Sequence, residues 1–351
     1  MNYSNTSKYY NPAIYIWLLT ITAMVLSIIV IGGLTRLTDS GLSMTDWRPI
    51  LGTIPPMSSD SWSVVFDMYK KTPEYKIVNK NMSLDEFKYI FWWEWFHRVF
   101  ARLIGIVFIL PLIYFTLKKQ IQSSLFIRLG AVFIFGLLQA FIGWWMVKSG
   151  LTENPYVSPY RLTFHLLNAL IIFSILLWIA MDYRCSSKIN FFSKPRTVEF
   201  YIFIAVILVF ITIASGGFMA GTNSGQSFNT FPLMNGKIIP DDYLIDDLGF
   251  FNIFENTVAI NFNHRWLSIF VFFYITVIFL KYIKFNNKLI PSILVFLVLF
   301  FLTLQVVLGI ITLLSNVYLP VASLHQTNSI LLLSALLISY HQIKVREVKN
   351  V

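Results

Sequence analysis

Eight long apolar segments limit what this chain can fold into more than any other feature of its sequence. They lie at about 13–33, 90–117, 126–147, 162–181, 200–219, 262–283, 289–314 and 322–340. A membrane-spanning helix needs roughly 20 apolar residues, and each segment is near that length. Charged residues make up only 13% of the chain, against about 25% in soluble domains. The sequence therefore predicts an all-α polytopic membrane protein with eight transmembrane helices.

The distribution of charge predicts how these helices are oriented. If the N-terminus lies in the cytoplasm, the cytoplasmic segments hold 14 basic and three acidic residues, and the rest of the chain holds 13 basic and 14 acidic ones. Cytoplasmic loops of membrane proteins carry an excess of lysine and arginine. We therefore expect both termini in the cytoplasm. The same rule explains the net charge of +10, so we expect contact with membrane lipid and not with nucleic acid.

The two halves of the chain repeat each other. The segment GGLTRLTDSGLS (32–43) aligns without gaps to GGFMAGTNSGQS (216–227), and QAFIG (139–143) matches QVVLG (305–309). Each half has four spans, an even number, so both halves enter the membrane from the same side and form a parallel repeat. We expect two four-helix bundles, formed by residues 1–190 and 191–351. Because the first apolar segment takes part in the repeat, we interpret it as a span and not as a signal peptide.

Four of the five histidines recur in this repeat. His97 and His264 are each followed by arginine, and His165 matches His325 in the same order along the chain. The predicted topology places all four at the outer ends of spans two, four, six and eight. Ionisable residues near a span suggest a functional site. We interpret the fifth, His341, at the cytoplasmic end of span eight, as an interfacial residue with no special role.

Paired histidines on facing helices suggest heme. Neutral imidazole is a common metal ligand, and heme iron can take one from each face. We therefore expect His97 with His165 to hold one heme iron, and His264 with His325 to hold another. Taken singly, each histidine is more readily explained as a hydrogen-bonded interfacial residue than as a metal ligand, and only the set of four favours the metal. Zinc or copper is the rival metal, but such sites usually add cysteine, carboxylate or methionine at short spacing, and no such cluster accompanies these histidines.

Three arginines lie close to the predicted iron ligands. Arg98 and Arg265 each follow a histidine, and Arg102 is one helical turn beyond Arg98. A guanidinium pairs well with a carboxylate, so these arginines are candidate partners of heme propionates. The alternative is that they extend to the lipid headgroups.

Glu94 is the informative difference between the halves. It lies three residues before His97 and so shares a helix face with it. Its counterpart in the second half is Asn261. A carboxylate beside a porphyrin can act as base or nucleophile, although a carboxylate near a helix N-terminus also simply complements the helix dipole. The asymmetry predicts a reactive first site and a second site that holds heme or passes electrons.

The remaining patterned residues are interpreted structurally. The long outer segments 34–89 and 220–261 are rich in turn formers and aromatics, which favours short interfacial helices that cover a site. The Gly-Gly pairs at 32–33 and 216–217 are expected to permit close helix packing rather than to touch a cofactor. We expect Gln139 and Gln305 to form interhelical hydrogen bonds.

These motifs together resemble those of the heme A synthase family. The resemblance rests on GGLTRLTDSGLSMTDWRPILGTIPP, EWFHR, HLLNA, NFNHR and LHQTNS and covers nearly the whole chain. It implies an enzyme of the bacterial inner membrane that oxidises a methyl group of heme O to a formyl group, giving heme A for assembly of cytochrome oxidase. It implies that His97 and His165 bind the substrate heme, that His264 and His325 bind a resident heme b, and that Glu94 is catalytic.

The resemblance also has a departure and leaves alternatives open. Some members carry a cysteine pair in the first outer loop, whereas the single cysteine here, Cys185, falls in a predicted cytoplasmic loop and cannot form an intrachain disulfide. The chain is therefore similar to the cysteine-free mitochondrial and alphaproteobacterial branch. Partners expected by resemblance are heme O synthase, cytochrome oxidase assembly factors and a second copy of the chain. The alternatives are a two-heme cytochrome b that reduces quinone or ferric iron, and a heme carrier.

Overall fold

The structure, a computed structural model, describes residues 10–46, 51–152, 154–185, 197–284 and 290–349. Eight of its helices are long and apolar enough to cross a membrane, which confirms the predicted fold class. They are α1 (Pro12–Leu37), α4 (Leu84–Leu117), α5 (Ser123–Gly150), α6 (Pro159–Cys185), α7 (Thr197–Gly221), α9 (Thr257–Lys284), α10 (Ser292–Leu314) and α11 (Leu319–Lys349).

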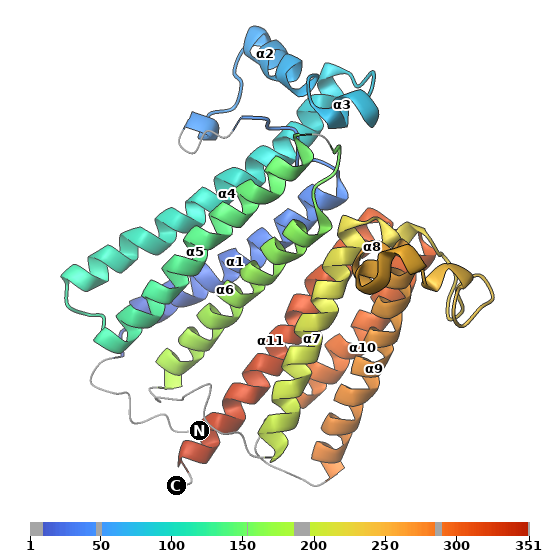
Figure 1. Cartoon of the computed structure of the whole chain (residues 1–351). Coiled ribbons are helices and arrows are strands. Elements are labelled where there is room, and N and C mark those ends of the chain that lie inside the picture. Colours follow the sequence, from blue (N-terminus) through green and yellow to red (C-terminus); the bar gives the residue numbers. More distant parts are fainter. Residues whose placement is uncertain (1–9, 47–50, 153, 186–196, 285–289, 350–351) are drawn as a thin grey trace.

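The eight helices lie in two groups (Figure 1). Helices α1, α4, α5 and α6 pack on one another, and so do α7, α9, α10 and α11. Contacts of α6 with α7 and of α11 with α1 and α6 join the groups. The predicted boundary between residues 190 and 191 lies outside the described residues. The two repeated bundles therefore remain a prediction that this grouping supports.

Local signals in the sequence set where the helices begin. Asn11 accepts a hydrogen bond from the backbone of Ala13 and is followed by Pro12, which suits the first position of a helix. Ser83 and Glu86 form a capping box that starts α4 at Leu84, earlier than the expected start near residue 90. The outer part of α4 thereby extends beyond the apolar segment and supports the first outer loop.

Both long outer segments form short helices, as predicted. The first contains η1 (Leu51–Thr53), α2 (Ser59–Tyr69) and α3 (Pro73–Ile77). It packs on the outer part of α4 through an apolar cluster of Phe66, Tyr69, Phe87, Ile90 and Phe91. The second contains η2 (Ser224–Gln226), η3 (Asp241–Tyr243), η4 (Asp246–Phe251) and α8 (Asn252–Glu255). Figure 1 places α2, α3 and α8 at the end of the bundle opposite the start of α1 and the end of α11.

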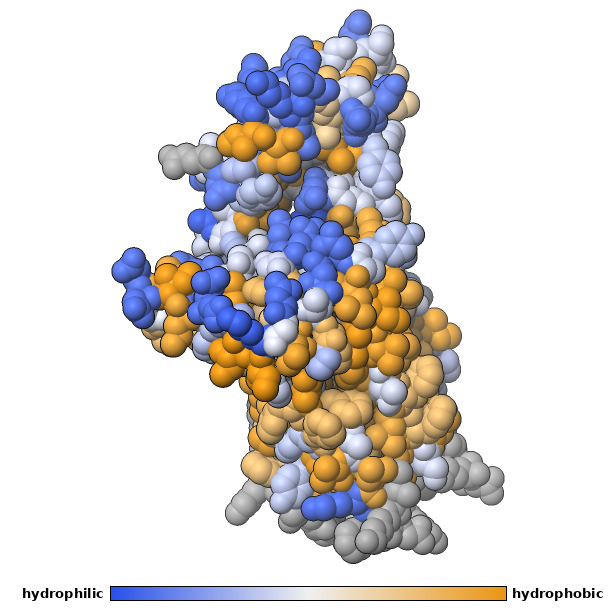
Figure 2. Space-filling view, turned by 90° about the vertical axis from the view of Figure 1, so that its right-hand side faces the viewer, coloured by the Kyte–Doolittle hydropathy of each residue, from blue (hydrophilic) through white to orange (hydrophobic). Residues whose placement is uncertain are grey.

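The surface has the polarity of a membrane protein. Figure 2 shows a broad hydrophobic belt over the helices and a mostly hydrophilic region at one end, where the first outer segment lies. Large apolar side chains on the outside of the bundle are solvent-accessible, including Phe270 and Phe273 of α9 and Phe296 of α10. This belt is the surface that lipid would cover.

One prediction about the opposite end of the bundle was wrong. His341 is 0% exposed, and its Nε2 lies 2.9 Å from Oδ1 of Asp182, a buried residue of α6. Arg128 of α5 forms an ion pair of 2.7 Å with the other carboxylate oxygen. His341 therefore joins α11 to α6 and is not a plain interfacial residue. Cys185 is likewise the last residue of α6 and does not lie in the loop that follows.

We expect Asp182→Ala to lower the free energy of unfolding by about 3 kcal/mol, because it leaves His341 and Arg128 without their buried acidic partner. Unfolding in mixed detergent micelles, followed by tryptophan fluorescence, measures the change. Asp85→Ala is the control, since Asp85 pairs with Lys88 but is 91% exposed, and exposed pairs contribute less than about 1 kcal/mol. Equal effects of the two substitutions would contradict the prediction.

Candidate functional site

Each of the four repeated histidines lies against a glycine of a neighbouring helix. A Cβ atom added to the glycine would come within 3.5 Å or less of the imidazole Cε1, closer than ordinary contact in three of the four cases. The pairs are Gly32 of α1 with His97 of α4, Gly143 of α5 with His165 of α6, Gly216 of α7 with His264 of α9, and Gly309 of α10 with His325 of α11. The expected close packing at Gly32 and Gly216 is thus packing against the predicted iron ligands themselves.

The structure brings the histidines together within each half. His97 of α4 and His165 of α6 lie in one group of packed helices, and His264 of α9 and His325 of α11 lie in the other. All four histidines are surrounded by many protein atoms. By solvent-accessible area, however, each residue is only partly buried. Side chains that line an internal space between helices have this property. The arrangement fits a planar group held between two imidazoles.

A matched amide pair adjoins one histidine in each half. Gln139 donates to the backbone oxygen of His165 at 3.1 Å and accepts from Asn168 at 2.7 Å. Gln305 lies 3.2 Å from Nδ1 of His325, and Asn328 donates to it at 2.7 Å. The predicted interhelical hydrogen bonds of both glutamines are confirmed.

The ligand chemistry favours heme over zinc or copper. In the part of the chain that the structure describes, three or more His, Cys, Asp or Glu side chains nowhere gather in a way that could hold a metal ion. Two histidines without such neighbours suit an iron whose other four ligands come from a porphyrin.

Glu94 is buried and held by three donors. Ser43 Oγ donates to its Oε2 at 2.7 Å, and the backbone N–H of Met44 donates to the same oxygen at 2.8 Å. Arg98 donates to Oε1 at 2.5 Å and also to the backbone oxygen of Met44. The side chain is only 3% exposed. Ser43 and Met44 of the first outer segment, together with Arg98 of α4, thus hold the carboxylate in one position.

The second half repeats this arrangement with an uncharged amide. Asn261 donates to the backbone oxygen of Ser224 at 2.6 Å and accepts from Nε of Arg265 at 2.6 Å. Arg265 also donates to the backbone oxygens of Thr230 and Phe228, at 2.7 Å each. The guanidinium of Arg265 therefore donates to the second outer segment, just as the guanidinium of Arg98 donates to the first. Contact of Arg98, Arg102 or Arg265 with a propionate stays a prediction.

A second buried carboxylate lies in the outer segment near Glu94. Tyr69 donates to Oε2 of Glu74 at 2.9 Å, and Asn79 donates to the Tyr69 hydroxyl at 2.7 Å. Burial raises the pKa of Glu74 to about 8, and the negative charge of Glu94 adds to the rise. Sequence patterns missed this pair because α2 and α3 show no motif at these positions.

We predict that the α2–α3 segment loses stability as pH rises from about 4.5 to 8. Below this window Glu74 is protonated in both the folded and the unfolded chain, whereas above it a buried charge must be kept in the folded one. Hydrogen exchange of residues 59–77 in nanodiscs, measured across this window, tests the prediction. Each variant is compared with wild type at the same pH. Glu74→Gln should not show the loss of stability with rising pH, whereas Asp67→Asn, at an exposed position, should show the same loss as wild type. An unchanged profile in Glu74→Gln would refute the assignment.

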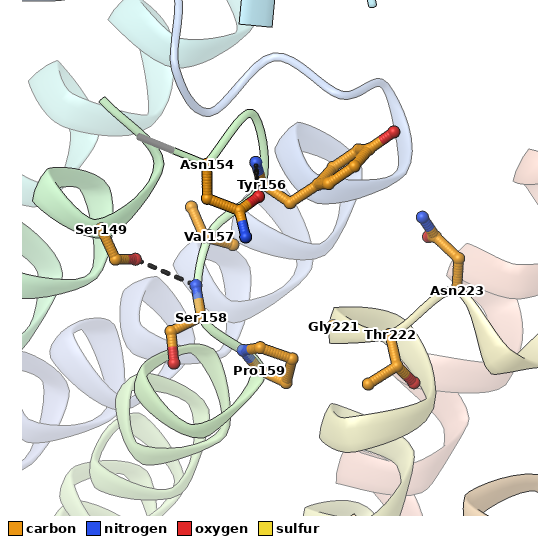
Figure 3. Close-up of a pocket in the computed structure, with 9 residues that line it drawn as sticks. All are labelled: Ser149, Asn154, Tyr156, Val157, Ser158, Pro159, Gly221, Thr222 and Asn223. Atoms are coloured by element: carbon orange, nitrogen blue, oxygen red, sulfur yellow. Dashed lines mark hydrogen bonds between the residues drawn. The ribbon is translucent and has the colours of Figure 1, made fainter. Parts of the chain in front are cut away.

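A pocket opens where the start of α6 lies next to the end of α7, at the junction of the two groups of helices (Figure 3). Its volume is about 350 Å³, and residues 154 and 156–159 before and at the start of α6 face residues 221–223 at the end of α7. Arg36 at the end of α1 donates to Asn223, one of the lining residues, at 2.8 Å. None of the predicted iron ligands lines this pocket, so it is separate from the histidine pairs.

Fold and site together define a class: a helical membrane protein with two histidines in each group of helices, one of which, His97, follows a buried carboxylate by three residues. Comparison with known proteins narrows the class. A family model described as "Cytochrome oxidase assembly protein" matches residues 15–337.

The relatives agree with one another. The chain is 44% identical to the heme A synthase of Wolbachia pipientis subsp. Culex pipiens, over 90% of this chain and 93% of that protein. It is 41% identical to that of Nitrosospira multiformis, over 94% and 93%, and 39% identical to that of Azorhizobium caulinodans, over 93% of both. The chain therefore belongs to the heme A synthase family, as its motifs predicted.

Proposed function

We propose that this chain is a heme A synthase, an oxidoreductase that converts a methyl group of heme O to the formyl group of heme A for cytochrome oxidase assembly. Family membership supports the reaction. The observation in the site that carries it is the buried carboxylate of Glu94, three residues from the predicted ligand His97, where the second half has Asn261. A site that only moved electrons would not need this difference between the halves.

The proposed assignment of the two sites follows this asymmetry. His97 and His165 hold the substrate, heme O, and His264 and His325 hold a resident heme b. The burial of Glu94 in the half that holds His97 and His165, and the uncharged Asn261 in the other half, support this assignment. The bound hemes supply the redox chemistry, while the protein supplies position and electrostatics.

Glu94 is the proposed catalytic residue. Conversion of a methyl group to an aldehyde with oxygen from water releases four protons and four electrons, and an external oxidant takes the electrons. A fixed carboxylate beside the reacting methyl group can accept a proton as that group is oxidised. Its three donors hold it in one orientation, so little reorganisation is needed when charge develops nearby.

The surroundings of the site complete the proposal. Arg98, Arg102 and Arg265 are the candidate partners of the heme propionates. The protein is multi-pass in the bacterial inner membrane with both termini in the cytoplasm, so the histidines lie toward the outer face. Residues 1–190 form the substrate half and 191–351 the resident-heme half. Heme O synthase, cytochrome oxidase assembly factors and a second copy of the chain are the proposed protein partners.

Glu94→Gln should keep both hemes and abolish heme A formation, because the amide is nearly isosteric with the carboxylate but cannot accept the proton. Acid–acetone extraction of protein purified from a host that makes heme O, with the hemes identified by mass, measures the outcome. Glu86→Gln, an exposed cap residue of the same helix, should still form heme A. Normal heme A from Glu94→Gln would refute the catalytic role, and heme B alone in the wild type would favour the two-heme cytochrome b.

Ser43→Ala should lower the rate of heme A formation about tenfold, since a hydrogen bond to a charged group contributes about 1.5 kcal/mol. Heme content should stay near wild type. The matched control is Ser227→Ala, which changes the corresponding serine of the second half and should leave the rate unchanged. Equal rates in the two variants would show that Ser43 does not act through Glu94.

A further inference from the structure

One serine distinguishes the two histidine pairs beyond the Glu94 difference. Ser215 of α7 places its Oγ 2.7 Å from Nδ1 of His264 on α9. This contact joins two helices, and the serine lies next to Gly216, against which the same imidazole packs. The hydroxyl thus sits at the edge of the ring that faces away from Nε2.

The direction of this hydrogen bond follows from the other contact of Ser215. Its Oγ also lies 2.8 Å from the backbone oxygen of Thr212, which can only accept. A hydroxyl has one hydrogen, so a serine that donates to Thr212 must accept from His264. The proton of the neutral ring is then on Nδ1. The lone pair of Nε2 is left free for a metal.

The first half lacks a corresponding hydrogen bond between a serine and a histidine ring. When the alignment of 32–43 with 216–227 is extended by one residue toward the N-terminus, Ser215 pairs with Ile31, whose side chain cannot hydrogen-bond. Among the residues that the structure describes, the buried Nδ1 of His97 has no hydrogen-bond partner. The opposite ligands differ in a similar way: Gln305 lies 3.2 Å from Nδ1 of His325, whereas the buried Nδ1 of His165 has no hydrogen-bond partner among the described residues.

We propose that Ser215 is a positioning residue that fixes the tautomer and orientation of His264 and thereby makes the second site retain its heme, whereas Ile31 leaves the first site able to exchange. The inference rests on the proposed function. A partner on the far nitrogen orients an iron-ligating histidine and makes it a stronger donor, and loss of such a partner typically costs 10- to 100-fold in metal affinity. A stronger donor also stabilises ferric iron, which lowers the midpoint potential of the heme.

The difference suits what each site must do. A substrate site has to take up heme O and release heme A in every catalytic cycle, so a looser ligand is an advantage there. A resident heme is useful only if it stays bound through many cycles. Two side chains at one repeat position, Ile31 and Ser215, give these two behaviours within the same helix framework.

The test uses the full-length protein, purified with its hemes. Heme loss to an excess of apoglobin and the midpoint potential of each heme are measured for wild type, Ser215→Ala and Ser215→Thr. We expect Ser215→Ala to lose heme B at least about tenfold faster and to raise the potential of that heme, and Ser215→Thr, which keeps the hydroxyl, to resemble wild type. Ser268→Ala is the matched control, because Ser268 donates to the backbone oxygen of His264 and not to its ring.

The outcomes separate this inference from the proposed function. Wild-type heme loss and potential in Ser215→Ala, or a Ser215→Thr variant as defective as Ser215→Ala, would overturn the role of Ser215. The proposed function would then still stand if extraction of the wild type yields heme O or heme A. If Ser215→Ala cannot be purified, Ile31→Ser decides: slower heme loss from the first site supports the inference, and an unchanged rate overturns it.

Discussion

The close approach of a glycine to a histidine in neighbouring helices is the contact on which the rest of this structure depends. It occurs four times, and at Gly143 and Gly309 a methyl group would already come within 2.9 Å of the imidazole. Glycine at these positions lets the helix backbone lie directly against the ring. The neighbouring helix then fixes the position of the ring along the edge that carries Cε1. Helix spacing and ring orientation are both set by this one contact.

On this shared framework a few side chains make the halves chemically different. Glu94 and Asn261 occupy the same repeat position and are held by the same kinds of partner, an arginine one turn later and the outer segment of their own half. Because the surroundings match, the exchange of a carboxylate for an amide changes charge and proton affinity with little change in shape.

The outer segments position the polar groups that lie near the histidines in sequence. Arg98 and Arg265 bind backbone oxygens of their own outer segments while also contacting Glu94 and Asn261. The first segment is further secured by aromatic packing on α4 and by the buried Tyr69–Glu74 pair. An outer segment that moved would therefore move the group beside the histidine as well.

The sequence by itself determined the eight helices, the four histidines, the contrast of Glu94 with Asn261 and the family. Apolar length decides whether a segment spans a bilayer, and motif spacing within one helix is visible in the chain. The tertiary structure alone decided the roles of His341, Ser43 and Ser215, because their partners lie 159, 51 and 49 residues away. Helical periodicity carries no information about which distant side chain will meet another. Those contacts are fixed only when the helices pack, because a buried polar group without a partner is costly.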